Sequence, residues 1–570
     1  RKVSYIMRFT QLINISRKYS KDVSALGFLR RNRQNLDIWA VLSIIFISII
    51  LIPNILIGIN FFSEATENWY HIKEHLLKNY IYNTLVLIVF TASFTMIIGT
   101  SLAWLISNYQ FPLRKFFRWG LILPLAIPAY IGAYTYNGIL NYTGVIQSTM
   151  RNTFDIHVTS QKYFNIMSMP GAIFIFTIFL YPYVYVITKG FLEKQSAALF
   201  ENTRLLGGGP FKTFFRAGLP LSRAAITGGV VLVILEVLND YGVVSYFGIQ
   251  TFSTAIFRTW YGMKDLDSAL KLAGILMVIV ILVLVFERLA RGRKQYSYTS
   301  ANIRPIEPQL VKGYKGWLIT AYCSVIFSVA FLIPVLQLTR WSVMTFEKIW
   351  STEFITLIYN SVFVATIAAS LIVVIALIVG NYTRLHKGWL PKVFSRIITL
   401  GYSIPGAAIA IAVITLFMSI DGFLASITNF LNLNSPVVLR TTLVMLVSAY
   451  IIRFMAVGYN AIEAGYEKIG TSFTEASRSL GMSTVKTFYK VDVPMLKGPL
   501  LGGFILVFVD ILKELPLTLF LQPFNFSTLA TQAYRYASDE MVQEAALASM
   551  LIILVSGLCI FYFHKVLDSK

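Results

Sequence analysis

Long apolar runs recur along the chain and are separated by short polar segments. Twelve of these runs approach the roughly 20 residues that a helix needs to cross the hydrocarbon core of a bilayer. Their approximate ranges are 39–60, 80–106, 119–140, 171–189, 225–247, 272–288, 317–339, 357–381, 398–419, 437–459, 499–521 and 547–564. The pattern predicts an all-α polytopic membrane protein with about 12 transmembrane helices.

The composition supports this prediction. Of the 570 residues, 56% are hydrophobic and 13% are charged, whereas soluble domains have roughly 45–50% apolar and about 25% charged residues. A water-soluble globule has too little interior for so much apolar surface, so a soluble or disordered protein is excluded. Cys323 and Cys559 both lie in apolar runs, and we expect them to be small buried hydrophobes rather than a disulfide or a metal site.

The positive charges are unevenly distributed between the two sides of the predicted membrane protein. With a cytoplasmic N-terminus, the inside segments contain 37 Lys and Arg residues and the outside segments 11. Such a bias is typical of cytoplasmic loops, so both termini, including a basic segment over 1–38, are expected in the cytoplasm. It also accounts for the formal net charge of +22 without a nucleic-acid partner.

The chain contains an internal repeat. A shift of 274 positions aligns Glu201 with Glu475, Arg204 with Arg478, Gly207 with Gly481, Pro220 with Pro494, and Phe252-Ser253-Thr254 with Phe526-Ser527-Thr528. A shift of 277 aligns Tyr82-Asn83 with Tyr359-Asn360 and Ile127-Pro128 with Ile404-Pro405. We therefore predict two halves of six spans each, 39–290 and 317–570, joined by a linker over 291–316. An even number of spans makes the repeats parallel, so the seam between them is the expected pathway.

The repeated loops, 196–223 and 470–497, share the pattern Glu-x5-Gly-x12-Pro. This pattern resembles the EAA loop of ABC importer permeases, whose signature is E-A-A-x-x-x-G. The second copy retains Glu475-Ala476, whereas Asn202 and Thr203 replace both alanines in the first. Segments 235–270 and 510–540 are similar to the fused two-half permeases of ferric iron importers.

The resemblance implies a type I ABC importer permease fold in a bacterial cytoplasmic (inner) membrane. It also implies a transport subunit that is not itself an enzyme and needs no cofactor or metal, with a dimer of ATP-binding subunits and an extracytoplasmic substrate-binding protein as partners. A short helix over about 196–206, ended by glycine, and its counterpart ending near Leu480-Gly481 correspond to the coupling helices. The implied coupling residues are Glu201, Arg204, Gly207, Pro220, Glu475, Arg478, Gly481 and Pro494.

Ionisable residues inside predicted spans are candidate pathway residues because charge in a bilayer is costly. Glu236 and Asp240 are spaced i, i+4, as are Asp510 and Glu514, and Lys513 lies beside the second pair. On one helix, each pair would share a face. The repeat places the two pairs opposite one another, where a ring of carboxylates at the outer mouth would favour an entering cation. Paired helix-end residues with a packing role are the alternative.

Other interpretations remain open from the sequence. An importer of the same type could carry thiamine, phosphonate or polyamine as cargo. Twelve spans in two halves are also compatible with a secondary transporter. The segment HIKEH (71–75) matches an inverted zinc-protease pattern, although a solvated helix end is the better interpretation. The glycine-rich segment GGGPFKT (207–213) lacks the glycine that precedes lysine in a phosphate-binding loop, so ATP hydrolysis is expected on another polypeptide. Ile127-Pro128 and Ile404-Pro405 predict bends within corresponding spans.

Overall fold

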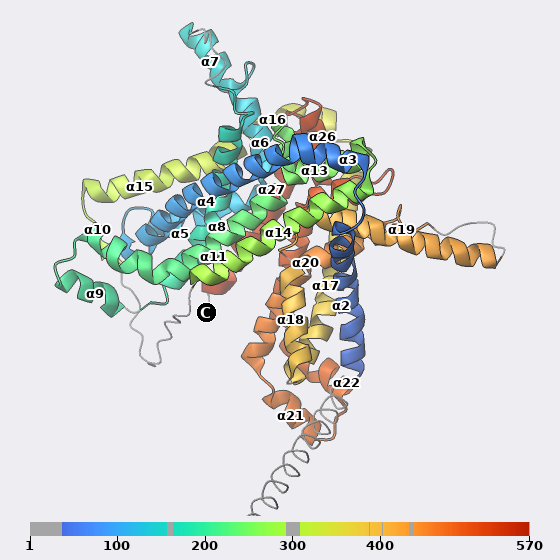
Figure 1. Ribbon diagram of the computed structural model, residues 1–570. Coiled ribbons are helices and arrows are strands. Elements are labelled where there is room, and N and C mark those ends of the chain that lie inside the picture. The colour runs from blue at the N-terminus through green and yellow to red at the C-terminus, as the bar shows by residue number, and fades with distance from the viewer. Residues whose placement is uncertain are drawn as a thin grey trace, which may run out of the picture.

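The computed structural model describes residues 37–156, 164–195, 197–291, 308–386, 388–401, 403–431 and 438–568. Residues 1–36 of the predicted basic segment and most of the predicted linker lie outside these residues. Nearly every described element is helical, as the apolar runs predict (Figure 1). One two-residue strand pair, β1 (Tyr109–Gln110) with β2 (Gln309–Leu310), runs parallel and ties the start of the second half to the first.

The first half contains the helices that follow in chain order. They are α2 (Ile38–Phe61), α3 (Glu67–His71), η1 (Ile72–Leu76), α4 (Leu77–Asn108), α5 (Arg114–Gly120), η2 (Leu123–Ala126), α6 (Ala129–Leu140), α7 (Val145–Phe154), α8 (Met169–Leu192), α9 (Ala197–Leu205), α10 (Pro210–Thr213), η4 (Phe214–Gly218), α11 (Leu219–Asn239), α12 (Gly242–Tyr246), α13 (Phe252–Phe257), η5 (Arg258–Gly262) and α14 (Leu266–Arg291).

The second half repeats this order with small changes. Its helices are α15 (Tyr314–Phe327), η6 (Ser328–Leu332), α16 (Ile333–Ile349), α17 (Thr352–Leu385), α18 (Trp389–Gly401), α19 (Gly406–Phe430), α20 (Leu443–Ile469), α21 (Ser472–Ser479), α22 (Thr484–Thr487), η7 (Phe488–Asp492), α23 (Val493–Met495), α24 (Lys497–Leu512), α25 (Pro516–Leu521), α26 (Leu529–Ser538) and α27 (Ala545–Asp568).

Ten helices among the described residues are long and apolar enough to cross a membrane, and twelve spans result if two bent helix pairs each count as one. The expected continuous spans over 119–140 and 499–521 are corrected here. The first is broken between η2 and α6 with a bend of 92°. The second is interrupted because α24 ends at Leu512 and α25 begins at Pro516, and the 73° bend between α23 and α24 lies just before this range.

The two prolines predicted to bend their spans stand at helix starts instead. Pro128 is the N-cap of α6 and Pro405 is the N-cap of α19, and both have nearly the same backbone angles. Proline lacks the N–H that a helix interior requires, so a helix readily begins beside it and not through it. The two corresponding spans are thus interrupted at equivalent positions.

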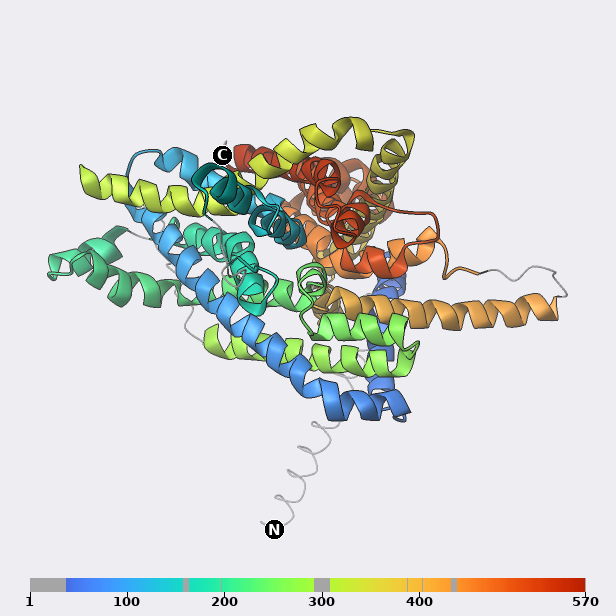
Figure 2. The same ribbon diagram turned by 90° about the horizontal axis from the view of Figure 1, so that it is seen from above.

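The two halves exchange their first spans. Helix α2 of the first half packs against α17, α18 and α19 of the second half. In return, α15 and η6 pack against α5, η2 and α8 of the first half, and the Thr320 hydroxyl donates to the Pro112 carbonyl. Figures 1 and 2 show α15 beside the first half, and Figure 1 shows α2 beside α17. This exchange joins the halves into one structure around the buried helices α8 and α20.

The structure also refines the repeat. Helix α10 and the π-helical turn η4 recur 274 residues later as α22 and η7. Beyond these elements the register changes: the Asn83 amide donates to the Gln250 carbonyl, and the Asn360 amide donates to the Ser527 carbonyl, a shift of 277. The alignment of Phe252-Ser253-Thr254 with Phe526-Ser527-Thr528 is therefore wrong by three residues, because α25 and the loop after it are longer than their counterparts.

Candidate functional site

The two EAA-like loops have the same local structure. Helix α9 is followed by Gly207 with φ of +78°, and α21 is followed closely by Gly481 with φ of +83°. The Gly208 amide donates to the Thr203 carbonyl, and the Met482 amide donates to the Ser477 carbonyl. This bond across five residues is the C-terminal closure that a left-handed glycine allows. The short helices and their glycine ends are therefore found where the sequence places them.

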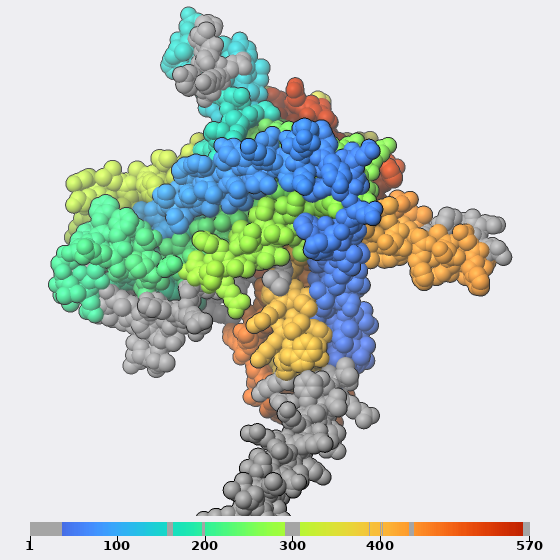
Figure 3. All heavy atoms as spheres, viewed as in Figure 1, coloured from blue at the N-terminus to red at the C-terminus, as the bar shows by residue number. Residues whose placement is uncertain are grey.

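Both EAA-like loops present exposed glutamate and leucine side chains. Glu201 and Glu475 are exposed, while Leu206 and Leu480, at equivalent repeat positions, have 84% and 83% of their surface exposed. The loop containing α9 and α10 projects from one edge of the molecule, and α21 lies at a separate end (Figures 1 and 3). The sequence analysis did not single out the two leucines, although the shift of 274 aligns them, and apolar residues so fully exposed indicate a docking surface.

The other four residues predicted for coupling are two arginines in the short helices and two prolines further along each loop. The backbone of Arg204 lies in α9, and Arg478 lies in the last turn of α21 with an exposed side chain. Pro220 and Pro494 lie in α11 and α23, directly after the π-helical turns η4 and η7, within the continuous helical runs Pro210–Asn239 and Thr484–Met495.

The second loop is attached to the bundle by a buried ion pair. Arg384, near the end of α17, lies with its Nη2 atom 3.0 Å from Asp492 Oδ1, and the two side chains are 8% and 2% exposed. Arg384 also donates to Thr474 Oγ1 of α21 and to the Gly470 carbonyl, while the Thr474 hydroxyl donates to Asp492. The guanidinium stacks on the ring of Tyr466. This network joins α17, α20, α21 and η7.

The first loop is attached by aromatic packing. The ring of Trp104 in α4 lies 5.4 Å from the ring of Phe200 in α9 and 5.3 Å from that of Phe214 in η4. Gly218 allows this approach, because a Cβ atom there would lie 2.5 Å from the indole. By the repeat, Phe200 corresponds to Thr474 and Gly218 to Asp492. The two halves thus hold equivalent loops by different chemistry.

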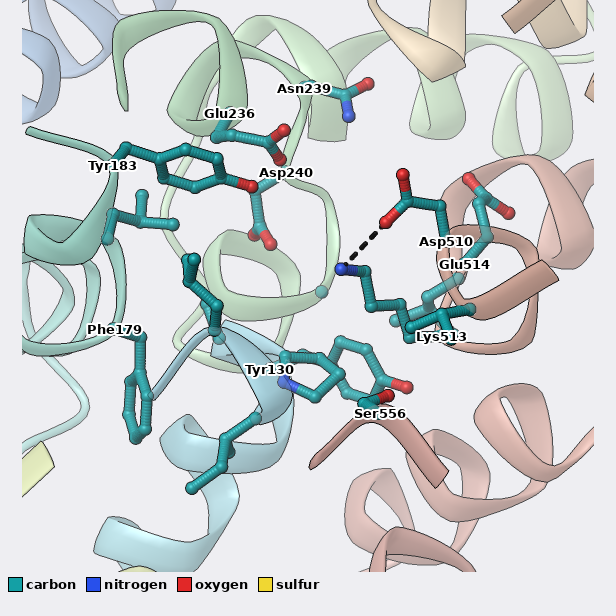
Figure 4. A pocket seen from close by; sticks show the side chains of 18 of the residues that line it. Tyr130, Phe179, Tyr183, Glu236, Asn239, Asp240, Asp510, Lys513, Glu514 and Ser556 are labelled. Atoms are coloured by element: carbon teal, nitrogen blue, oxygen red, sulfur yellow. Dashed lines mark ion pairs between the residues drawn. The ribbon is translucent and has the colours of Figure 1, made fainter. Parts of the chain in front are cut away.

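A cavity of about 430 Å³ lies at the seam and contains the candidate pathway residues. Both halves line it. Its polar lining residues are Tyr130, Tyr183, Glu236, Asn239, Asp240, Arg453, Asp510, Lys513, Glu514 and Ser556. Figure 4 shows the side chains from the two halves facing the same space. The structure therefore brings together all five ionisable residues that the sequence analysis named at membrane depth.

Two of the four carboxylates are helix caps. Asp240 accepts a hydrogen bond from the Val243 amide at the start of α12. Glu514 accepts from the amides of Leu517 and Thr518 at the start of α25. The expectation that each acidic pair shares a helix face is wrong, because α11 ends at Asn239 and α24 ends at Leu512. Both carboxylates fall beyond those ends and satisfy amides that would otherwise lack partners.

The other carboxylates, Glu236 and Asp510, lie on the helices themselves and belong to different halves. The Lys513 ammonium is 2.9 Å from Asp510 Oδ1. On the other wall, Glu236 and Tyr183 line the same space (Figure 4). Figure 4 shows Lys513 extending into the space between the two walls. The positive charge of Lys513, from the second half, thus lies in the same cavity as the negative charge of Glu236, from the first half.

Asn239 is a site residue that the sequence analysis missed. Its side-chain oxygen accepts from the Gly406 amide, the first of α19, and from the guanidinium of Arg453. It therefore caps a helix of the other half at the break after Pro405. The only feature of the sequence that points to Asn239 is its alignment, by the shift of 274 positions, with Lys513 of the second half.

The alternative motifs find limited structural support. His71 and His75 lie 5.0 Å apart between ring centroids, close to the start of α4. Within the described part of the chain, no group of three or more His, Cys, Asp or Glu side chains is arranged to hold a metal ion. The segment GGGPFKT lies within the first EAA-like loop and includes α10, with no strand preceding it among the described residues of that loop.

Comparisons with known proteins agree with this organisation. A family model described as "Binding-protein-dependent transport system inner membrane component" matches residues 95–287 and again 372–570. The Fe(3+)-transport system permease protein FbpB 2 of Haemophilus influenzae is 25% identical over 487 residues, covering 85% of this chain and 89% of that protein. The ferric transport system permease protein FbpB of Actinobacillus pleuropneumoniae is 22% identical, covering 79% of this chain and 65% of that protein.

One solved structure, a bacterial ABC transporter involved in the import of the acidic polysaccharide alginate, covers 44% of this chain and 96% of the matched chain. Its TM-score is 0.34 at 16% identity, which is too low to carry an argument about this structure.

Proposed function

Because the chain belongs to the family of binding-protein-dependent transport system inner membrane components, we propose that it is the fused permease of an ATP-driven importer that moves ferric iron into the bacterial cytoplasm. The observation that carries the choice of cargo is similarity to a ferric iron transport permease along 85% of this chain and 89% of the relative. A similarity over nearly the full length of both chains includes both halves and the seam.

The EAA-like loops are the proposed contacts with the ATP-binding subunits. Each presents a short helix, an exposed glutamate and, just before its glycine, a leucine more than four-fifths exposed. A helix with an exposed apolar anchor and a carboxylate beside it suits insertion into a groove of another protein. In this proposal, each loop docks on one subunit of a dimer, and closure of that dimer moves the two loops together.

The seam cavity is the proposed pathway for the cargo. It is lined by both halves and contains Glu236 and Asp510 on opposite walls, and oxygen ligands of this kind suit hard cations. At the end of the seam away from the EAA-like loops, Tyr241 and Phe257 of the first half pack against Phe520 of the second. Rocking of the halves would open and close these contacts, giving alternating access from an outer binding protein to the cytoplasm.

The test begins with the complex as it forms in its own cell. The chain is purified from its native locus in mild detergent with any ATP-binding subunit that accompanies it, and reconstituted into proteoliposomes. Uptake of radiolabelled ferric iron is then measured with and without ATP, and with the substrate-binding protein that co-purifies. We expect ATP-dependent uptake of iron, and little competition by thiamine, phosphonate or spermidine.

Two double variants complete the design. Glu201→Ala with Glu475→Ala removes a carboxylate from each EAA-like loop and is expected to reduce both co-purification of the ATP-binding subunit and uptake. Glu67→Ala with Glu353→Ala removes two exposed carboxylates from the first turns of α3 and α17 and serves as the matched control. Uptake that is independent of ATP would support a secondary transporter instead, and ATP-dependent uptake of another cargo would refute the assignment to iron alone.

A further inference from the structure

Lys513 occupies an unusual position in the seam cavity. It follows the end of α24, and its ammonium lies 2.9 Å from Asp510 of the same half. Glu236, which belongs to the first half, lines the same cavity. Figure 4 shows the ammonium in the space between the two cavity walls. A tethered positive charge therefore lies where the carboxylates of the two halves converge.

The other two carboxylates of the cavity already have fixed tasks. Asp240 and Glu514 accept hydrogen bonds from the first amides of α12 and α25. A carboxylate that caps a buried helix end cannot rotate toward a passing ion without leaving those amides unsatisfied. This leaves Asp510 and Glu236 as the pair whose charge faces the open space of the cavity.

The fold does not require a lysine at this position. The shift of 274 positions aligns Lys513 with Asn239 of the first half. Asn239 caps α19 across the seam through the Gly406 amide and contacts Arg453. A lysine cannot serve as such a cap because an ammonium has no acceptor. The second half has therefore exchanged a capping amide for a charge, and that charge is directed at carboxylates.

Two buried hydroxyl groups line the same cavity without a hydrogen-bond partner. The side chain of Tyr130 is 4% exposed and that of Ser556 is 1% exposed, and neither oxygen has a partner among the described residues. Figure 4 shows both among the side chains that line this space. Buried polar groups normally have partners, so these oxygens are available to a hydrated ion or to a displaced ammonium.

We propose that Lys513 is a tethered counter-ion that neutralises Asp510 and Glu236 while the pathway is empty and is displaced by a positively charged cargo. This inference rests on the proposed function and gives its cargo a chemical form, an oxygen-coordinated cation that reaches the carboxylates as Lys513 moves away. Two facing carboxylates without the lysine would hold a multivalent cation tightly. With the lysine, the cargo competes with an attached charge, so binding stays weak enough for release.

The test compares variants of the whole complex in lipid nanodiscs. Lys513→Met removes the charge and keeps the length of the side chain, Lys513→Arg keeps the charge, and Lys513→Met with Asp510→Asn removes both partners. The probe is radiolabelled Fe³⁺ supplied as its nitrilotriacetate complex, and retained iron is measured by equilibrium dialysis. Uptake is measured on the same preparations in proteoliposomes.

We expect Lys513→Met to retain at least about tenfold more Fe³⁺ at a given free concentration, which corresponds to about 1.4 kcal/mol, and to import it more slowly. Lys513→Arg should retain iron within about twofold of wild type, and the double variant should return to the wild-type level. Unchanged or lower retention by Lys513→Met overturns the proposal, and lower retention would indicate that Lys513 recognises an anionic ligand of the metal.

The proposed function and this inference fail in different ways. If the wild-type complex imports no iron, the proposed cargo is wrong whatever the variants do. If wild type imports iron and Lys513→Met behaves as wild type, the cargo stands and the role of Lys513 is wrong. A lysine with only a structural role would change the yield of assembled complex but not the amount of iron retained per complex.

Discussion

Removing the guanidinium of Arg384 tests how the second EAA-like loop is held. The change Arg384→Met leaves Asp492, whose side chain is 2% exposed, without its charge partner and removes the donors to Thr474 and to the Gly470 carbonyl. Breaking a buried ion pair by removing one partner costs about 3–5 kcal/mol. Because the Thr474 hydroxyl still donates to Asp492, we expect the lower end of that range, about 3 kcal/mol.

Hydrogen exchange converts this cost into a local measurement. If opening of α21 is limited by the network, about 3 kcal/mol corresponds to a loss of protection of roughly 100-fold for its backbone amides, since about 1.4 kcal/mol is a factor of ten. The measurement is hydrogen–deuterium exchange with mass spectrometry on the protein in nanodiscs. Peptides over 472–479 report the second loop, and peptides over 197–205 serve as an internal control, because aromatic rings and not Arg384 hold α9.

Two further variants sharpen the comparison. Arg384→Lys keeps the charge but loses the fork that reaches Asp492, Thr474 and Gly470 together, so it should lie between wild type and Arg384→Met. The double change Arg384→Met with Asp492→Leu removes both buried charges and should recover part of the protection lost in the single variant. Unchanged exchange over 472–479, or an equal increase over 197–205, would refute the reasoning that the ion pair fixes the second loop specifically.

Three further predictions concern single contacts. Gly218→Ala places a Cβ atom 2.5 Å from the indole of Trp104 and should loosen the first EAA-like loop by about 1–3 kcal/mol, seen as faster exchange over 197–205 only. Leu480→Asp charges a side chain that is 83% exposed and should weaken co-purification of an ATP-binding subunit at least about tenfold without changing the melting temperature of the isolated chain. The pKa of Glu544 lies below its ordinary value because the Lys348 ammonium donates a hydrogen bond to it, so the pair stabilises the fold above the ordinary pKa and loses that effect as the pH falls through the lowered one. Lys348→Met should therefore cost up to about 0.5 kcal/mol at pH 7, since Lys348 is largely exposed, and nothing in acid, as measured by thermal unfolding at both pH values.

The features predictable from the sequence are those set by local patterns. Apolar runs of span length indicate helices wherever they occur, and a glycine after a short amphipathic segment indicates a left-handed helix end, as found at Gly207 and Gly481. Proline at 128 and 405 indicates an interrupted helix because it lacks an N–H, although the sequence predicted a bend where the structure has a helix start. The repeat adds a check, since a pattern found twice in one register is rarely accidental.

The features not predictable from the sequence depend on partners that are distant along the chain. Spacing alone suggested that Asp240 shares a helix face with Glu236, but the helix ends one residue earlier, where its carboxylate caps the next helix. Arg384 and Asp492 are separated by more than 100 positions, and neither belongs to a recognised motif. Asn239 contacts a helix of the opposite half, which no local pattern reveals.

A signal for these missed residues does exist in the differences between the repeats. Where both halves keep the same residue, as with the glutamate and glycine of the EAA-like loops, the residue serves a task performed twice in the same way. Where the halves differ at a buried polar position, as at Asn239 and Lys513, the fold tolerates either residue and the choice reflects a task performed once. A cargo crosses the seam once per cycle, and a perfectly symmetric seam would place identical charges opposite each other, where they repel. A lysine in one half and an asparagine in the other removes that repulsion, and a fused chain makes the difference possible because its halves are free to diverge independently.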